Sequence, residues 1–282
     1  MKIGADSLPA GADKERLHAA ALALEKQHGS AEGIESTLLS RRRATYAAAV
    51  ASDPLNYDVW FDWLRLEESE ISTRWAAAGT GAPPPADALA SARDVYEQAI
   101  AAVPPVAEKR FWRRYIYFWL YYAVFEELVA LDSARARAVL KEALRIVPHQ
   151  RFTFAKLWLA AAQAEVRARD VTGARKLLGV ALGLCPKRKI LTGYLALENA
   201  LGEVERVRKL TERGVQLEAT AAAAWLRFAD LEKSLGETER ARAIFDLALA
   251  QPVLDSPELV WKTAIGAALH RPRASEAPAW EK

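Results

Sequence analysis

Apolar and aromatic residues recur in this chain at the spacing of amphipathic helices, and the helices come in pairs. The clearest first helix carries Trp225, then Phe228, and then Glu232. These positions share one helical face, because steps of three and four residues return to the same side of a helix. The second helix of this pair carries Arg242, an apolar and aromatic run, and ends before Pro252. This arrangement predicts two short helices that face each other.

The same pair recurs along the sequence. Five copies of the first-helix pattern are complete: Trp60/Trp63/Glu67, Trp119/Tyr122/Glu126, Trp158/Ala161/Glu165, Leu191/Tyr194/Glu198 and Trp225/Phe228/Glu232. A weaker copy, His18/Ala21/Glu25, lies near the start of the chain, and a copy without its glutamate, Trp261/Ala264/Ala268, lies near the end. The second-helix arginines are Arg43, Arg93, Arg137, Arg175, Arg208 and Arg242. In the later pairs the arginine follows the glutamate by ten or eleven residues. A helix pair repeated in phase is the sequence signature of a solenoid.

The predicted fold class is therefore all-α, a right-handed α-solenoid of TPR-like helix pairs with no sheet. We expect residues 13–269 to form one continuous array of about six helix pairs plus one unpaired helix. The ends, residues 1–12 and 270–282, are expected to be disordered. An unpaired last helix would leave an apolar face open, so the chain is either part of a longer array or covered there by another molecule.

The first of two irregularities is an insertion. Glu67 and Arg93 are separated by 26 residues where about ten is usual. The segment between them contains the run of glycine and proline at 79–85, which cannot continue a helix. The sequence predicts that the helix starting near residue 57 ends at 69 and that a loop occupies approximately 70–88. No Gly-Lys-Ser/Thr follows, so this loop is not a phosphate-binding loop.

The second irregularity is an extended first helix, expected over residues 106–130. Its other side carries Lys109, Arg110, Arg113 and Arg114, close to several aromatic residues. Interleaved cations and aromatic rings could hold phosphate or stack on a base, which makes these four residues candidates for contact with a partner or with RNA. The alternative is that the aromatic rings form the core between repeats and the cations are solvated or paired with acidic neighbours.

The recurrent glutamates and arginines are interpreted as structural. Their spacing across a short turn predicts that Glu and Arg of one pair meet between its two helices, in a charge-assisted and possibly bidentate contact. Removing one partner of such a pair would strand a buried charge. A catalytic role is rejected because the same glutamate recurs five times, whereas an active site is built once.

Composition narrows the functional classes. The chain has 282 residues, 39 basic and 36 acidic, with a formal net charge of +3. This near balance permits weak contact with an acidic partner but does not indicate a dedicated nucleic-acid surface. The single cysteine fits a reducing compartment, and neither a signal peptide nor a membrane span is expected, so we expect a soluble intracellular protein.

Candidate catalytic chemistry is sparse. His18, His28, His149 and His270 are scattered, without metal-ligand spacing. Cys185 has no histidine nearby in sequence and is interpreted as a structural thiol. Neither a nucleotide fingerprint nor a nucleophile elbow is present. We therefore expect no enzyme activity, no cofactor, no metal site and no small-molecule substrate.

The paired signatures resemble the HAT (half-a-TPR) repeat of RNA-processing scaffolds. More closely, they resemble the crooked-neck-like pre-mRNA splicing factors of that repeat family. The likeness covers approximately residues 17–265 and includes linker residues that helix packing alone does not require. The segments that carry it are 33–43, 56–67, 103–110, 148–158 and 241–245.

The resemblance implies a nuclear, non-catalytic scaffold for spliceosome assembly within the nineteen complex. Its partners would be other HAT-repeat and Myb-type splicing factors, and the chain would correspond to a middle portion of a longer protein. Three alternatives remain: an RNA-binding module using the basic cluster, a TPR-like adaptor for a peptide tail, or a HAT protein of 3′-end cleavage or ribosomal RNA processing.

Overall fold

The structure is a computed structural model, and its described part consists of helices. The described residues are 16–17, 19–20, 23–24, 26–27, 31–79 and 81–269. No strand occurs among them, which confirms the all-α prediction. None of the helices in this described part is long and apolar enough to cross a membrane. The weaker copy His18/Ala21/Glu25 lies outside these residues, as do His28, His270 and both predicted disordered ends.

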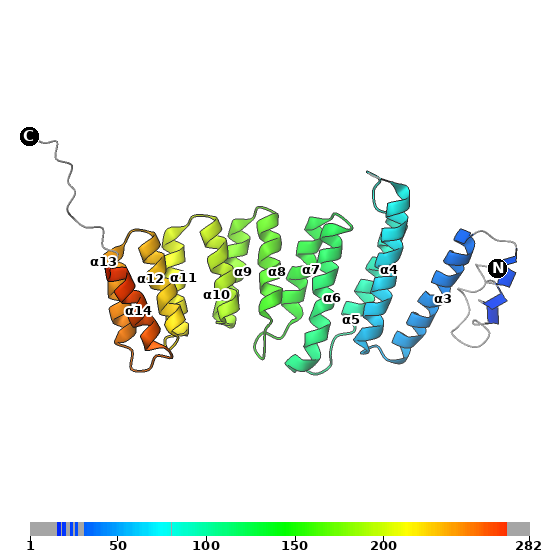
Figure 1. Cartoon of the computed structure of the whole chain (residues 1–282). Coiled ribbons are helices and arrows are strands. Elements are labelled where there is room, and N and C mark those ends of the chain that lie inside the picture. The colour runs from blue at the N-terminus through cyan, green and yellow to red at the C-terminus, as the bar shows by residue number, and fades with distance from the viewer. Residues whose placement is uncertain are drawn as a thin grey trace, which may run out of the picture. The chain divides into compact units, whose positions relative to one another are not determined.

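The chain divides into two compact units, Met1–Ala168 and Arg169–Lys282. The helices of the first unit are α3 (Ala31–Ser52), α4 (Tyr57–Ala78), α5 (Ala86–Ala101), α6 (Lys109–Leu128), α7 (Ser133–Ile146) and α8 (Ala155–Arg167). Each contacts the next along the chain, and α6 also contacts both α4 and α8 (Figure 1). The first helices α4, α6 and α8 thus form one row and the second helices α3, α5 and α7 another. A single array over both units stays a prediction.

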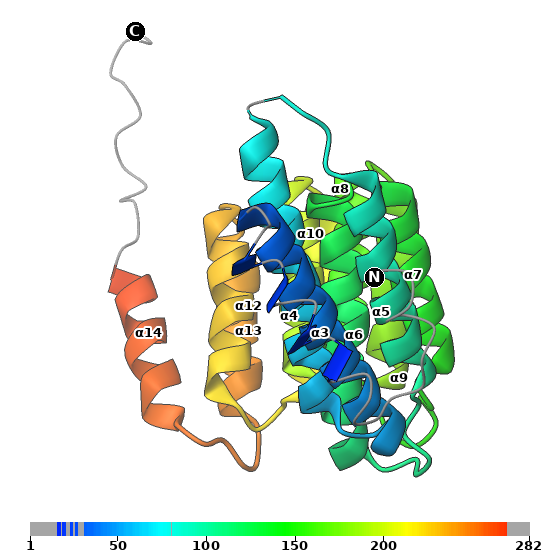
Figure 2. The same ribbon diagram turned by 90° about the vertical axis from the view of Figure 1, so that its right-hand side faces the viewer.

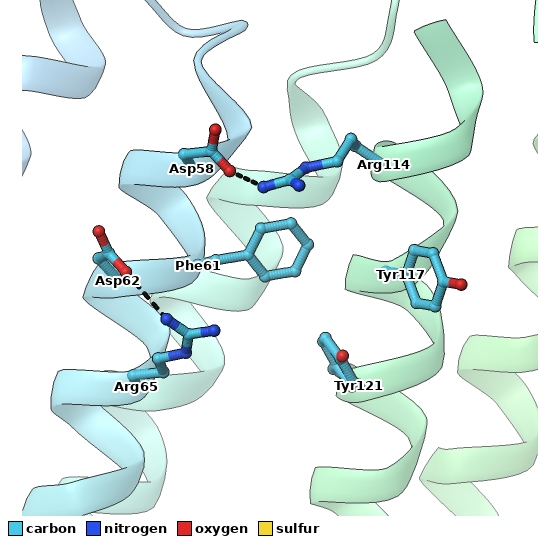
Figure 3. Close-up of a pocket in the computed structure, with 7 residues that line it drawn as sticks. All are labelled: Asp58, Phe61, Asp62, Arg65, Arg114, Tyr117 and Tyr121. Atoms are coloured by element: carbon cyan, nitrogen blue, oxygen red, sulfur yellow. Dashed lines mark hydrogen bonds and ion pairs between the residues drawn. The ribbon is translucent and has the colours of Figure 1, made fainter. Parts of the chain in front are cut away.

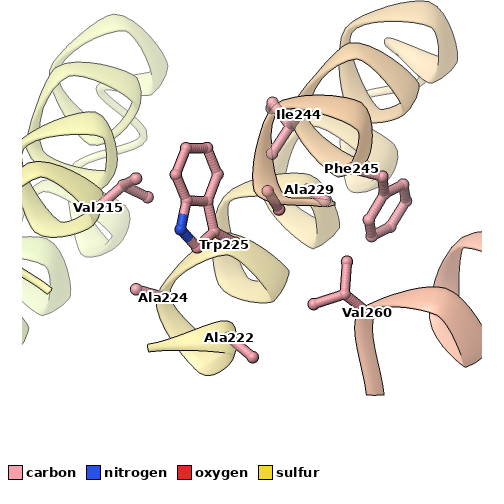
Figure 4. Packing of buried hydrophobic residues seen from close by; sticks show 9 residues of the cluster. Val215, Ala222, Ala224, Trp225, Ala229, Ile244, Phe245 and Val260 are labelled. Carbon is pink, nitrogen blue, oxygen red and sulfur yellow. The ribbon is translucent and has the colours of Figure 1, made fainter. Parts of the chain in front are cut away.

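The second unit repeats this arrangement. Its helices are α9 (Val171–Leu184), α10 (Arg188–Ala200), α11 (Val204–Leu217), α12 (Ala222–Ser234), α13 (Thr238–Leu249) and α14 (Pro257–Leu269). In its core the Trp225 ring lies between Val215 of α11 and Ile244 of α13, and Val260 of α14 packs on the far side (Figure 4). Burying an indole ring among aliphatic side chains is a large hydrophobic contribution. The signature tryptophan therefore joins three successive helices.

The turn inside each of the four later pairs has a recurrent backbone conformation. A residue with positive φ precedes an acidic residue at the start of the second helix, and these residues are Leu131, Arg169, Gly202 and Gly236. In three of these turns the N–H of the acidic residue donates to the carbonyl of the signature glutamate, from Asp132 to Glu126, from Glu203 to Glu198 and from Glu237 to Glu232. Positive φ is strained for residues with a Cβ, which explains glycine at two of the four positions.

The signature tryptophan also anchors the loop before its helix. The indole Nε1 donates to a backbone carbonyl six residues earlier: Trp60 to Pro54 at 3.0 Å, and Trp225 to Ala219 at 2.8 Å. Pro54 and Ala219 are the residues that follow each second-helix arginine by eleven positions. The hydrogen bond therefore fixes where one pair ends and the next begins.

The predicted loop at 70–88 is only partly correct. The α4 helix continues past the expected end at residue 69 to Ala78, and the connecting segment covers only 79–85. Helix formers from Glu70 onward keep Ile71 in phase with the buried face, and its side chain is fully buried. The end of α4 projects beyond its neighbours before the chain returns to α5 (Figures 1 and 2). Glycine and proline therefore mark only the reversal, and most of the insertion extends the helix.

The extended helix expected over 106–130 is α6, which begins at Lys109 and ends at Leu128. Two of its tryptophans divide between them the role of the signature tryptophan. Trp112 takes the anchoring role, because its Nε1 donates to Val106 at 3.0 Å. Trp119 keeps the seven-residue spacing to Glu126, but its Nε1 has no partner among the described residues. A shift of seven residues is two helical turns, so both rings point to the same side. The α6 helix is thus lengthened at its start by one heptad.

The turn geometry gives a prediction about stability. Gly236 has φ of +81°, so Gly236→Ala should destabilise the second unit by about 1 kcal/mol, because alanine is strained there. Gly179 lies within α9 with nothing close to an added Cβ, so Gly179→Ala should stabilise by about 1 kcal/mol. Urea unfolding followed by circular dichroism measures both. Equal effects of the two substitutions would contradict the assigned turn.

Candidate functional site

Each signature glutamate is buried and receives an arginine from the preceding pair. Arg43 binds Glu67 through Nε and Nη2 at 2.7 and 2.6 Å. The other contacts are Arg93 to Glu126 at 2.8 and 2.7 Å, Arg175 to Glu198 at 2.8 and 2.7 Å, Arg208 to Glu232 at 3.0 Å, and Arg137 to Glu165 at 2.9 Å. All five glutamate side chains are 2% exposed or less. We call this series of contacts the Arg–Glu ladder.

The ladder corrects the predicted pairing. Arginine and glutamate of the same pair, ten or eleven residues apart, were expected to meet, but the bonded residues are 23 to 33 positions apart. The reason is packing: α5 and α7 in the first unit, and α11 and α13 in the second, each contact the first helix of their own pair and that of the following pair. Its signature arginine lies on the side of the following pair. Glu126 does receive a cation from its own pair, but this is Arg135, at 3.0 Å.

The last arginine of the series has no ladder partner in the described residues. Arg242 instead forms an ion pair with Glu239 at 2.6 Å on its own helix. Ala268 stands in the glutamate position of the last first helix. Trp261 of α14 is 56% exposed, whereas Trp225 at the equivalent position is 8% exposed. Trp225 packs between two second helices, and α14 contacts only one in the described part of the chain.

The remaining signature side chains lie in the core to differing degrees. Trp60, Trp63, Trp119, Tyr122 and Trp158 are buried, whereas Tyr194 and Phe228 are half-buried. Burial also has a chemical consequence: it raises the pKa of Tyr122 to about 12. These side chains are buried or half-buried among the helices, and their structural role stays a prediction.

The loop between α7 and α8 contains the one histidine whose side chain the structure describes. The His149 ring bonds the Thr153 hydroxyl and the Leu144 carbonyl, both at 2.8 Å, and lies against the Trp158 ring. Trp158 in turn donates to the Thr153 hydroxyl at 2.8 Å. His149 is thus part of a hydrogen-bonded loop. Cys185 is buried, in agreement with its interpretation as a structural thiol.

The burial of the glutamates predicts that the ladder contacts contribute strongly to stability. Arg43→Ala should destabilise the first unit by about 3 kcal/mol, because Glu67 would be left as a buried carboxylate without its cation. Arg74→Ala is the matched control: Arg74 also binds a carboxylate through two nitrogens, Nη1 and Nη2 to Asp87 at 2.7 and 2.8 Å, but on the surface. Arg74→Ala should lower the free energy of unfolding much less, because solvent screens exposed ion pairs. Denaturant unfolding measures the free energy of unfolding of both variants. Equal decreases in the two variants would refute a stabilising role of burial.

The contribution of Glu165 to the stability of the fold depends on pH. Burial acts to raise the pKa of its carboxyl group, but hydrogen bonds from Lys141 and Arg137 outweigh this and hold the pKa below its ordinary value of 4.5. A carboxyl group with a lowered folded-state pKa stabilises the protein above its unfolded-state pKa, and this contribution is lost as pH falls through the folded-state value.

Glu165→Gln should therefore be less stable than the wild type at pH 7, and the difference should shrink as the pH falls below about 4.5. The measurement is the free energy of unfolding of both proteins over a pH series. A difference that stays constant at acidic pH would show that the charge of Glu165 does not contribute. Lys141→Gln, which removes one of the two cations, should give an intermediate slope.

The four candidate basic residues do not form one cluster. Arg114 forms an ion pair with Asp58 and lies over the Phe61 ring at 5.5 Å. Arg110 binds Glu108 at 2.7 Å, and Lys109 lies over the Phe154 ring at 5.6 Å. Arg113 is exposed. The interpretation that these cations pair with acidic or aromatic neighbours thus describes three of the four.

Arg114 instead belongs to a hollow between the first helices α4 and α6. The Phe61 ring projects from α4 and stacks on Phe118 at 4.2 Å, while Tyr117 and Tyr121 approach from α6 (Figure 3). Arg65 pairs with Asp62 at 3.2 Å on the same wall. The hollow has a volume of about 400 Å³ and is lined by Asp58, Phe61, Asp62, Arg65, Arg114, Tyr117 and Tyr121.

A second hollow of about 340 Å³ continues along the same two helices and shares Phe61, Arg65 and Tyr121 with the first. Its further lining residues are Leu64, Glu68, Ser72, Tyr96, Val124, Phe125, Leu128 and Val129. We call the two hollows together the α4–α6 groove. The sequence reasoning did not identify it. A signal was present, because residues 121, 124 and 128 add an apolar row to a helix whose core face is already aromatic.

The histidine, cysteine and carboxylate side chains in the described part of the chain form no group of three or more that could hold a metal ion. The walls of the groove carry two ion pairs, Asp62 with Arg65 and Asp58 with Arg114. The arrangement is suited to contact with another macromolecule.

The comparisons with known proteins agree with the sequence resemblance. The chain is 47% identical to "Pre-mRNA-splicing factor CLF1" of Paracoccidioides brasiliensis over 264 residues, which is 94% of this chain and 36% of that protein. "Protein crooked neck" of Drosophila melanogaster is 46% identical over 92% of this chain and 35% of its own length. The chain is homologous to crooked-neck proteins over about a third of their length. The predicted resemblance is confirmed; its place in the middle stays a prediction.

Other comparisons add little. The mouse "Crooked neck-like protein 1" is 47% identical over 86% of this chain and 33% of its own length. No family model matches the sequence. Among solved structures, the type IV pilus biogenesis factor PilW aligns with a TM-score of 0.38 at 15% identity, covering 89% of this chain and all of that chain. The TPR protein YrrB aligns at 0.36 and 12%, over 78% and 97%. These scores are too low to bear on function.

Proposed function

We propose that this chain is a non-catalytic scaffold for spliceosome assembly in pre-mRNA splicing. It acts in the nucleus through protein–protein contacts within the nineteen complex. The observation that carries the proposal is 47% identity to a pre-mRNA splicing factor over 94% of the chain. Because the chain spans about a third of its relatives, the activity of a complete protein of this kind is part of the proposal.

The arrangement of charge supports a scaffold. The strongest polar contacts are used inside the repeat stack, where they hold successive helix pairs in register. The α4–α6 groove remains on the row of first helices with aromatic walls. Interfaces between proteins favour aromatic side chains in this way. The partners proposed are other spliceosomal proteins, of the HAT-repeat and Myb types.

The alternatives have less support. An RNA-binding role would use Lys109, Arg110, Arg113 and Arg114, but Arg110 and Arg114 are paired with carboxylates. The printed names of the relatives favour splicing over 3′-end cleavage and ribosomal RNA processing. RNA contact at the edge of a protein assembly remains compatible with the exposed Arg113.

The proposal predicts what co-purifies with the chain. Affinity purification from nuclear extract, followed by mass spectrometry, should retain splicing proteins both before and after nuclease treatment, because protein contacts hold them. The Arg43→Ala variant disrupts the ladder, so it should be less stable than the wild type and should recover less of those proteins.

Two outcomes would contradict the proposal. Loss of every partner after nuclease would mean that RNA holds the assembly. Absence of splicing proteins from both samples would mean that this portion does not function in spliceosome assembly.

A further inference from the structure

The two walls of the α4–α6 groove present side chains at the same helical spacing. The lining of α4 includes the row Asp58, Phe61, Arg65, Glu68 and Ser72, and the lining of α6 includes the row Tyr117, Tyr121, Val124 and Leu128. Both rows advance by alternating steps of three and four residues, which is the spacing of a coiled-coil seam. The α4 row is about 21 Å long at 1.5 Å per residue. The groove therefore runs along the helix axes for about four turns.

The α6 wall is unusually exposed for its apolar character. Tyr121 and Val124 are each 50% exposed and Leu128 is 66% exposed. They lie on one face, opposite the buried aromatic row of the same helix. Single apolar residues on a surface are ordinary, whereas a continuous row beside a groove marks an interaction site. Phe61 lines both hollows, and its ring is held by stacking on the buried Phe118 ring.

The walls favour a helical ligand over an extended peptide. An extended peptide needs partners for its backbone N–H and C=O groups, and these usually come from the edge of a sheet. Both walls here are α-helices, whose own backbone groups are bonded internally. A ligand helix satisfies its backbone by itself and offers apolar side chains at matching intervals.

The charges of the groove disfavour a nucleic acid. Its lining includes three carboxylates, of Asp58, Asp62 and Glu68, and two guanidinium groups, of Arg65 and Arg114. Asp58 and Asp62 pair with those two arginines, and Glu68 accepts a hydrogen bond from Tyr96 at 2.5 Å. A polyanion would be repelled by the carboxylates. An amphipathic helix flanked by residues of both charges complements this near-neutral surface.

We propose that the α4–α6 groove binds one amphipathic helix of another protein, about four turns long, with an apolar stripe at heptad spacing and flanks of mixed charge. The stripe packs on Phe61, Tyr121, Val124 and Leu128. This inference rests on the proposed scaffold function and names the kind of partner that one of its surfaces takes.

The probe for a test is a displayed library of peptides about 18 residues long, with leucine fixed at heptad-spaced positions and the other positions varied. Peptides are selected on the wild-type chain, and their affinity is measured by fluorescence anisotropy. Val124→Glu and Leu128→Glu place a charge on the α6 wall at exposed positions, where folding should be preserved, as circular dichroism would verify. Val180→Glu is the control, because Val180 is 52% exposed on α9, outside the groove.

The selected helix should bind the wild type and the Val180→Glu variant equally. Its affinity should fall by about tenfold or more in the Val124→Glu and Leu128→Glu variants, which corresponds to about 1.4 kcal/mol. Raising the salt from about 50 to about 200 mM should change the affinity only a few fold, since few ions are released. The proposal is overturned if no helix is selected, or if both groove variants bind as well as the wild type. It is equally overturned if oligouridine competes with a steep salt dependence.

The outcomes separate this inference from the proposed function. If the groove variants no longer bind the helix but still retain splicing proteins from nuclear extract, the groove binds a helix and the scaffold uses other surfaces. If the helix binds as predicted but no splicing protein is recovered with the wild type, the groove is supported as a helix-binding site and the proposed scaffold function is refuted.

Discussion

The ion pair between a buried glutamate and an arginine of the preceding helix pair is the contact on which the rest of this structure depends. Glu126 and Glu198 are completely buried, and a carboxylate in that position is costly unless it is paired and hydrogen-bonded. In each of the five contacts the signature arginine comes from the preceding pair, and Glu126 also receives Arg135 from its own pair. Each pair requires its neighbour, and only the correct stacking register brings the two groups together. This is how a quasi-linear array acquires a unique arrangement.

The ladder also determines which surfaces are available for function. The signature charges are directed between the pairs, so the groove on the first helices is formed by aromatic rings and exposed ion pairs. The lengthening of α6 at its start and of α4 at its end adds surface on that side of the first unit. The regular second unit has no such extensions. A shared repeat thus holds the helix pairs together within each unit, and local extensions of particular helices create a surface that a partner could recognise.

The repeats, the helix class and the structural role of the signature residues could be predicted from the sequence, because they depend on local periodicity. The partner of each arginine could not. Arg137 and Glu126 are close in sequence, but Arg137 lies on the side of the following pair, and sequence distance contains no such information. Glycine and proline near residue 80 identified a reversal but not that α4 continues to Ala78. The α4–α6 groove needed the relative position of two helices, which no single helix pattern provides.

The most direct measurement is a pair of double-mutant cycles on one glutamate. The first combines Glu126→Gln with Arg93→Met, and the second combines Glu126→Gln with Arg137→Met, each followed by the free energy of unfolding. The account predicts a coupling energy above about 1 kcal/mol for Glu126 with Arg93, which bind each other at 2.7 Å. It predicts coupling near zero for Glu126 with Arg137, which binds Glu165 instead. Strong coupling to Arg137 with none to Arg93 would contradict the inter-pair ladder.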